Sequence, residues 1–187
     1  MRVVVAVTGA SGIVLAKRLL EELKGHGHET HLIVSRGAAD VAEDEDVDLD
    51  EMRGLSSAVH EAGDMRSILA SSSNPVDAMV VVPCSMKTLS SIANGYADNL
   101  ITRAAENALK MGWRLIVVPR DTPLTLAAIE NMRRLKLGGA LILPPNVAYY
   151  NKPETADDVT DFIVGRILDA LRIDHSLYRR WRGKSHK

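Results

Sequence analysis

The chain has 187 residues, 46% of them hydrophobic, and this length and composition predict one domain with a single sizeable core. The formal net charge of −1 argues against nucleic-acid binding, and the single cysteine, Cys84, excludes an internal disulfide framework and a Cys-rich metal site. No apolar run approaches the ~20 residues that span a bilayer, so we expect a cytoplasmic protein without membrane insertion.

Short apolar, β-branched runs alternate with longer segments of helical periodicity. This alternation predicts βαβ units that build a parallel sheet, and the near-continuous apolar runs indicate strands buried on both faces. In chain order, the predicted strands are 3–7, 30–34, 58–60 (the weakest pattern), 79–82, 114–118 and 140–143. The predicted helices are 12–24, 98–111, 125–137 and 155–171.

These elements predict an α/β fold, a single-domain Rossmann-like three-layer sandwich with a central parallel sheet. In this interpretation residues 1–175 form the domain and 176–187 form a basic, aromatic C-terminal tail, because the hydrophobic periodicity fades near Ser176. The sequence leaves three possibilities for the tail: it frays, docks on a neighbouring subunit, or covers a ligand.

Two loops at predicted strand ends carry residues suited to an anionic ligand. The first, 8–12, contains glycines that allow a ligand to approach the backbone closely. The second, 83–88, offers two hydroxyls, a lysine and backbone N–H groups at a helix start. Because ligands of open parallel sheets bind at the carboxyl ends of strands, and the first loop lacks both the dinucleotide fingerprint and the P-loop pattern, we predict a mononucleotide site.

Other polar residues follow strands at the same predicted edge. Ser35 follows strand 30–34, where its hydroxyl can reach a ligand or cap a helix. Arg120 and Asp121 follow strand 114–118 and could serve phosphate binding and proton transfer, or form a surface ion pair with Asp121 or its neighbour Thr122 capping the next helix. The acidic run at 43–46 is expected to lie in a solvated helix end or loop.

A second set of residues could bind a phosphate. Arg103 and Lys110 lie about two turns apart on one face of helix 98–111, which Asp98 is expected to cap. Two cations on one face indicate an anion site, whereas a solvated face is the simpler interpretation of either alone. Tyr150, beyond the chain-breaking pair Pro144-Pro145, and Arg166 on the last helix could contact a phosphate or serve packing.

Together these motifs resemble the flavin prenyltransferases of UbiX type, within the HFCD flavoprotein fold. The resemblance extends from about Arg2 to Trp181. Its motifs are Gly9 to Gly12, Pro83 to Leu89, Ile92 to Ala105, Arg120 to Leu124, Glu130 to Met132, Pro144-Pro145, Tyr150 and Gly165 to Asp169.

The resemblance implies a metal-independent transferase that joins a dimethylallyl group from dimethylallyl monophosphate to N5 and C6 of reduced FMN. The product, prenylated FMN, is the cofactor of UbiD-type decarboxylases, which are the implied recipients. The resemblance also suggests a homododecamer with active sites at subunit contacts.

Site residues follow from the resemblance by position. The implied FMN contacts are Ala10, Ser11, Gly12, Ser35, Ser85, Met86, Lys87, Thr88 and Arg120. The implied prenyl phosphate contacts are Arg103, Lys110, Tyr150, Arg166 and Trp181. The implied catalytic residues are Ser11, Glu45, Lys110, Asp121 and Tyr150, with Glu45, Asp121 and the released phosphate all open as the base for ring closure.

Two departures from the family pattern affect the implied site. Asp121 stands where the family usually has glutamate, one methylene longer. Ile13-Val14-Leu15 replace a common aromatic residue, so the prenyl pocket is expected to be aliphatic.

Two other functions are kept as alternatives. An FMN-dependent cysteine decarboxylase of the same fold needs a histidine base, and no histidine of this chain lies in a comparable loop. A non-catalytic flavin carrier would leave Lys110, Tyr150 and Arg166 without a role.

Overall fold

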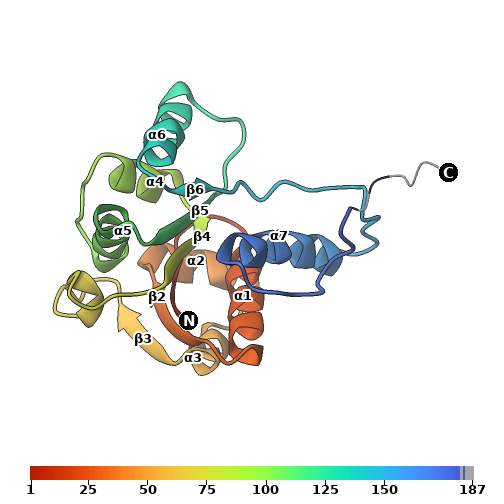
Figure 1. Cartoon of the computed structure of the whole chain (residues 1–187), viewed down its shortest axis with the longest axis horizontal. Coiled ribbons are helices and arrows are strands. Elements are labelled where there is room, and N and C mark those ends of the chain that lie inside the picture. The colour runs from red at the N-terminus through yellow and green to blue at the C-terminus, as the bar shows by residue number, and fades with distance from the viewer. Residues whose placement is uncertain (182, 184–187) are drawn as a thin grey trace.

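A six-stranded parallel sheet forms the centre of the molecule, a computed structural model that describes residues 1–181 and 183 (Figure 1). The strand order is β3-β2-β1-β4-β5-β6. The strands are β1 Arg2–Val7, β2 Glu29–Val34, β3 Ala58–Glu61, β4 Ala78–Cys84, β5 Arg114–Pro119 and β6 Leu141–Ile142.

Helices cover both faces of this sheet. They are α1 Ile13–Gly25, α2 Arg36–Asp44, α3 Leu49–Leu55, α4 Met86–Ala93, α5 Leu100–Met111, α6 Leu126–Leu137 and α7 Ala156–Leu171, with a 3-10 turn η1 at Ile68–Ala70. The helices α1, α2, α3 and α7 pack on one face, and α4, α5 and α6 pack on the other (Figure 1). Within the described residues, no helix is both long and apolar enough to cross a membrane.

Alternate residues of each central strand enter different cores. Val3 and Val5 of β1 belong to the core under α1 and α7, whereas Val4 and Ala6 belong to the core under α4 and α5. Both faces of the strand are therefore dry, which explains why its sequence is continuously apolar rather than alternating. The predicted α/β class and parallel three-layer architecture are confirmed.

Local differences from the predicted elements have simple causes. Strand β6 begins one residue later than predicted because the Ala140 N–H donates to the Leu135 carbonyl of α6, and the prolines after Leu143 prevent its extension. Asn99, not Asp98, caps α5: its Oδ1 accepts the Thr102 N–H at 3.1 Å, while the Thr102 hydroxyl accepts the Asn99 N–H. The acidic run forms the end of α2 and the turn after it.

The chain order creates a switch point between β1 and β4. From β1 the chain builds β2 and β3 on one side, then crosses back to place β4 on the other side of β1. The connections on the two sides leave β1 in opposite directions, so a crevice opens beyond the carboxyl ends of these strands.

Two glycines meet at this crevice. A Cβ on Gly9 would lie 2.9 Å from the backbone carbonyl of Gly37 in α2, closer than real Cβ contacts. A Cβ on Gly37 would lie 3.5 Å from the Cα of Gly9, an ordinary contact. The loop after β1 can therefore approach α2 only because Gly9 has no side chain.

We expect Gly9→Ala to destabilise the ligand-free protein by about 1–3 kcal/mol, since the loop and α2 must separate to admit the methyl group. For a domain of this size that is a fall of several degrees in Tm. Gly37→Ala is the matched control, and we expect an unchanged or slightly higher Tm because alanine favours the helix. Thermal unfolding by circular dichroism measures both, and equal Tm values would contradict the close-approach argument.

Candidate functional site

A pocket of about 460 Å³ lies where β1, β2 and β4 end. The lining includes Gly9, Ser35, Arg36, Ser85, Lys87, Thr88 and Asn99. Among these, Ser35, Ser85 and Asn99 are the N-caps of α2, α4 and α5, so these helices all begin at the pocket. Their partial positive charges, together with the cations Arg36 and Lys87, suit the pocket to an anion.

The two serines at this edge act as helix caps as well as lining the pocket. The Ser35 Oγ accepts the Ala38 N–H at 3.1 Å, and the Ser85 Oγ accepts the Thr88 N–H at 3.4 Å. Each cap satisfies one of the free N–H groups of a first helical turn and leaves others directed at the pocket. The cap and ligand interpretations of Ser35 are therefore compatible.

Thr8 joins the two ligand loops. Its side chain is buried, and its hydroxyl donates to the Pro83 carbonyl at 2.8 Å while accepting the Ser85 N–H at 2.8 Å. This contact fixes the start of the α4 loop to the end of β1. Sequence reasoning missed Thr8 as a site residue, because its partners lie more than seventy positions away along the chain.

Glu45 occupies the N-terminus of α1. Its two carboxylate oxygens accept the Gly12 N–H at 2.7 Å and the Ile13 N–H at 2.8 Å. Gly12 has φ +104°, which favours glycine. Glu45 also shares a cavity of about 520 Å³ with Ser11 and Gly12. Glu45 thus contacts the glycine loop. Its negative charge neutralises the partial positive charge at the N-terminus of α1, which could otherwise bind a ligand phosphate.

The other residues predicted to act at the flavin lie in the first loop, at the start of α4 and after β5. Ala10 is buried within the first loop, and Met86 is the first residue of α4. Arg120 directly follows β5, and its backbone N–H donates to the Cys84 carbonyl at 3.1 Å. Asp121 is exposed, and its Oδ1 accepts the Thr122 N–H at 2.9 Å. Thr125, rather than Asp121 or Thr122, caps α6.

Three of the residues predicted to bind the prenyl phosphate lie together on or beside α7. The Tyr150 ring contacts Trp181 edge-on, with centroids 5.8 Å apart, and both line a cavity of about 220 Å³ with Arg179 and Arg180. Arg166 is linked to them through Tyr178: it donates to the Tyr178 hydroxyl at 3.3 Å, and the Tyr178 ring packs on Phe162, which contacts Tyr150. Tyr150, Arg166 and Trp181 therefore come together within one chain, on a surface rich in arginine.

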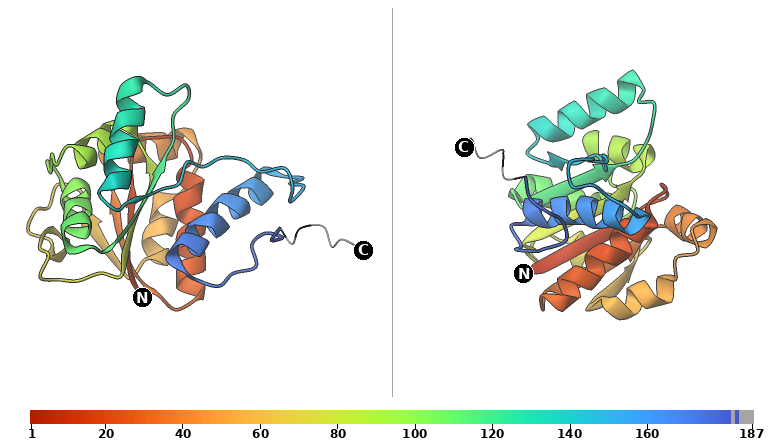
Figure 2. Two further views of the ribbon diagram at one scale, coloured as in Figure 1. Left: turned by 45° about the horizontal axis from the view of Figure 1, so that its top comes forward. Right: turned by 90° about the vertical axis from the view of Figure 1, so that its right-hand side faces the viewer.

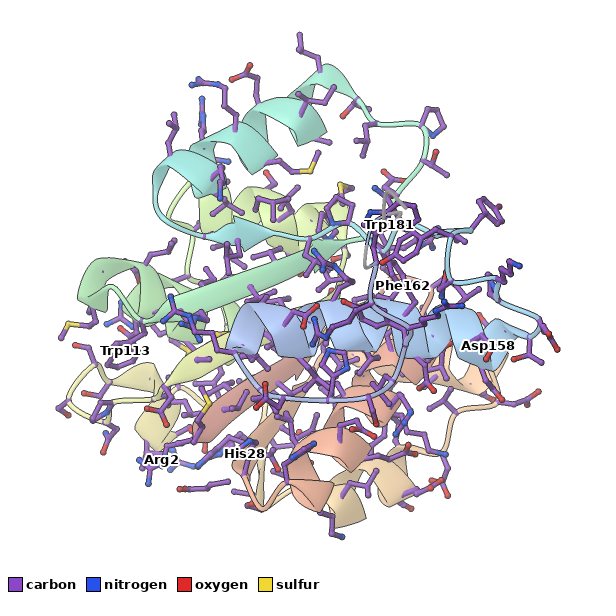
Figure 3. All side chains as sticks on the ribbon, turned by 45° about the vertical axis from the view of Figure 1, so that its right-hand side comes forward. Arg2, His28, Trp113, Asp158, Phe162 and Trp181 are labelled. Carbon is purple, nitrogen blue, oxygen red and sulfur yellow. The ribbon has the colours of Figure 1, made fainter. Side chains whose placement is uncertain are left out.

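Arg103 and Lys110 lie elsewhere. Arg103 donates to the Ala70 carbonyl at 3.2 Å and pairs with Glu106 at 2.8 Å. Lys110 is exposed in the last turn of α5, just before β5 begins near Trp113. Figure 3 shows Trp113 near the start of β5 and Trp181 near its end, so Lys110 is at the wrong edge of the sheet to join Tyr150 in the same chain.

Cys84 lies at the end of β4, beside the second ligand loop. Cys84 is fully buried, and burial raises the pKa of its thiol, so it stays protonated and is not a nucleophile. Among the described residues, no group of three or more His, Cys, Asp and Glu side chains is arranged to hold a metal ion.

Comparisons with known proteins agree on one family. The model of the flavoprotein family matches residues 1–168. The flavin prenyltransferase UbiX of Methanocaldococcus jannaschii is 50% identical over 182 residues, which are 97% of this chain and 98% of that protein.

Two solved structures superimpose over nearly the full chain. AnUbiX (PadA1), crystallised in complex with FMN and dimethylallyl pyrophosphate, has a TM-score of 0.96 and 40% identity, covering 98% of each chain. The dodecameric FMN-dependent UbiX-like decarboxylase from Escherichia coli O157:H7 has a TM-score of 0.95 and 40% identity, covering 98% of this chain and all 100% of the other.

We expect Thr8→Val to weaken FMN binding about tenfold, because it leaves the partly buried Ser85 N–H without its acceptor, a loss of about 1 kcal/mol or more. Thr8→Ser retains the hydroxyl and should bind FMN within about twofold of the parent protein. Fluorescence titration of FMN measures both variants. Parent-like FMN affinity in Thr8→Val would contradict the assignment, because it would show that the hydroxyl does not position the loops.

Proposed function

This chain belongs to the flavin prenyltransferases of UbiX type within the flavoprotein family, and we propose that it transfers a dimethylallyl group from dimethylallyl monophosphate to reduced FMN. The new bonds form at N5 and C6, and phosphate leaves. The observation that carries the proposal is the pocket at the switch point, where helix starts and cations converge in a chain 50% identical to a flavin prenyltransferase.

The starts of α2 and α4 are suited to hold the FMN phosphate. Ser35, Ser85, Met86, Lys87 and Thr88 contribute hydroxyls, first-turn N–H groups and an ammonium there. The N-terminus of α1 is not available, because Glu45 already binds it. The flavin ring therefore extends toward Ala10, Ser11 and Gly12, with Arg120 at the end of β5.

Departure of phosphate from an allylic carbon requires that its growing negative charge be neutralised. Tyr150 and Arg166, with Trp181 beside them, form one part of such a set. Lys110 would have to come from a neighbouring copy, since it lies at the opposite edge of its own sheet. The dodecameric assembly of the Escherichia coli relative supports this arrangement.

Ring closure at C6 adds a proton to the prenyl double bond and removes the proton from C6, so it needs a proton donor and an acceptor. Glu45 is held beside Ser11 by two N–H groups, whereas Asp121 is exposed and accepts only its neighbour's N–H. Both carboxylates and the departing phosphate remain acceptors in the proposal. The product, prenylated FMN, then passes to a UbiD-type decarboxylase.

Anaerobic incubation with reduced FMN and dimethylallyl monophosphate tests the function. We expect flavin with a new absorbance spectrum and a mass gain of one C5H8 unit. A parallel sample with the diphosphate tests leaving-group preference, because the AnUbiX complex contains the pyrophosphate. Bound but chemically unchanged flavin in both samples would contradict the proposal and favour a flavin carrier.

We expect Asp121→Asn to slow ring closure more than formation of the first bond, because ring closure needs a proton delivered to the double bond and another removed from C6, whereas the first step only releases the N5 proton. A singly alkylated flavin should then accumulate in single-turnover spectra. Asp121→Glu is the control and should stay within about tenfold of the parent rate, since it restores the carboxylate. Unchanged rates of both steps in Asp121→Asn would leave Glu45 or the phosphate as the base.

A further inference from the structure

The segment after α7 folds back along that helix and is held there by one carboxylate (Figure 2). Asp169 Oδ2 accepts the Tyr178 hydroxyl at 2.5 Å and Arg166 Nη1 at 3.1 Å. Asp169 Oδ1 contacts Arg180 Nη2 at 2.7 Å and His175 Nε2 at 3.1 Å. A single side chain of α7 thus binds the returning segment 173–181 at three points. This segment includes the described start of the predicted tail 176–187, and from here on the word tail denotes residues 173–181 only.

The surface of α7 is shaped to receive the tail. A Cβ on Gly165 would lie 2.6 Å from the Tyr178 ring and 2.7 Å from the His175 ring, so only glycine fits beneath them. The Tyr178 ring packs on Phe162 at 4.9 Å, and Phe162 in turn contacts Tyr150 at 5.9 Å. The tail is therefore continuous with the aromatic residues around the proposed prenyl phosphate site.

The neighbours of Asp169 favour the ionised form of its carboxyl group. Burial of this carboxyl raises its pKa, but hydrogen bonds from Tyr178, Arg180 and His175 outweigh burial and leave the pKa below its ordinary value. The ionised carboxylate faces Arg166 and Arg180 on either side. Its negative charge is thus balanced, and the adjoining cavity with Arg179 remains positive.

The contacts of Arg166 leave part of its guanidinium available. Its hydrogen bonds to Asp169 and to the Tyr178 hydroxyl both use Nη1. Within the described part of the chain, this orientation keeps Nε and Nη2 for an incoming phosphate. Asp169 therefore fixes the direction of the guanidinium without filling its binding face.

We propose that Asp169 is a positioning residue for the prenyl phosphate site: it docks the tail on α7, which orients Arg166 and holds Trp181 against Tyr150. Asp169 acts through these residues and touches no substrate atom. The inference rests on the proposed function for the identity of the phosphate, but the docking of the tail can be measured without activity.

Asp169→Asn is the principal test, because it keeps the side-chain size but removes the charge and one acceptor oxygen. We expect the KM for dimethylallyl monophosphate to rise at least about tenfold, while the Kd for FMN stays within about twofold, since the flavin pocket lies on other elements. Asp157→Asn is the matched control, an exposed carboxylate in the first turn of the same helix, and should change neither constant.

Fluorescence of Trp181 reports docking directly. The chain has two tryptophans, so a Trp113→Phe background isolates the tail signal. In that background we expect Asp169→Asn to shift the emission to longer wavelength and lower its anisotropy, and Asp157→Asn to leave both unchanged. An inactive parent protein would overturn the proposed function yet leave this docking test valid.

Tyr178→Phe guards against a folding defect in Asp169→Asn. It removes only the hydroxyl and preserves the ring packing on Phe162, so we expect a smaller rise in KM and a smaller spectral shift in the same directions. The proposal is overturned if the folded Asp169→Asn protein keeps its KM and its Trp181 emission. If that variant does not fold, an unchanged KM and emission in Tyr178→Phe overturn it equally.

Discussion

The convergence of helix starts at the carboxyl edge of the sheet is the constraint on which the site depends. Because all the strands are parallel, α2, α4 and α5 turn their positive ends toward the same place. Such like poles repel one another unless an anion lies between them. The buried Thr8 hydroxyl ties the loops after β1 and β4 to each other, which fixes where α4 begins at this edge.

Sequence predicts those parts of the molecule whose signals are local. The apolar runs gave the strands because both faces of each central strand are buried, and the loops at 8–12 and 83–88 fall at the switch point as parallel topology requires. Ser35 and Ser85 were found through residue type and position. Both side chains cap a helix and line the pocket, so the same local sequence pattern predicts both features.

Long-range contacts explain what the sequence could not predict. The pattern of the acidic run indicates a solvated connector, and only the family resemblance singled out Glu45, because its contact with α1 joins residues 33 positions apart. Asp169 looks like an ordinary helix residue until the tail returns to it. Lys110 has the spacing of an anion site on α5, but the direction of α5 places it at the far edge of the sheet, and only a neighbouring copy could bring it to a phosphate.

Two carboxylates, Glu45 and Asp169, each bind positively charged groups in a different part of the molecule. Glu45 accepts the first N–H groups of α1, which leaves the starts of α2 and α4 as the free positive ends for the flavin phosphate that we propose there. Asp169 gathers arginines on α7 and the tail, outside the flavin pocket. In the proposed arrangement the two phosphates are held by different elements, so an allylic carbon between them would meet the flavin ring rather than the flavin phosphate.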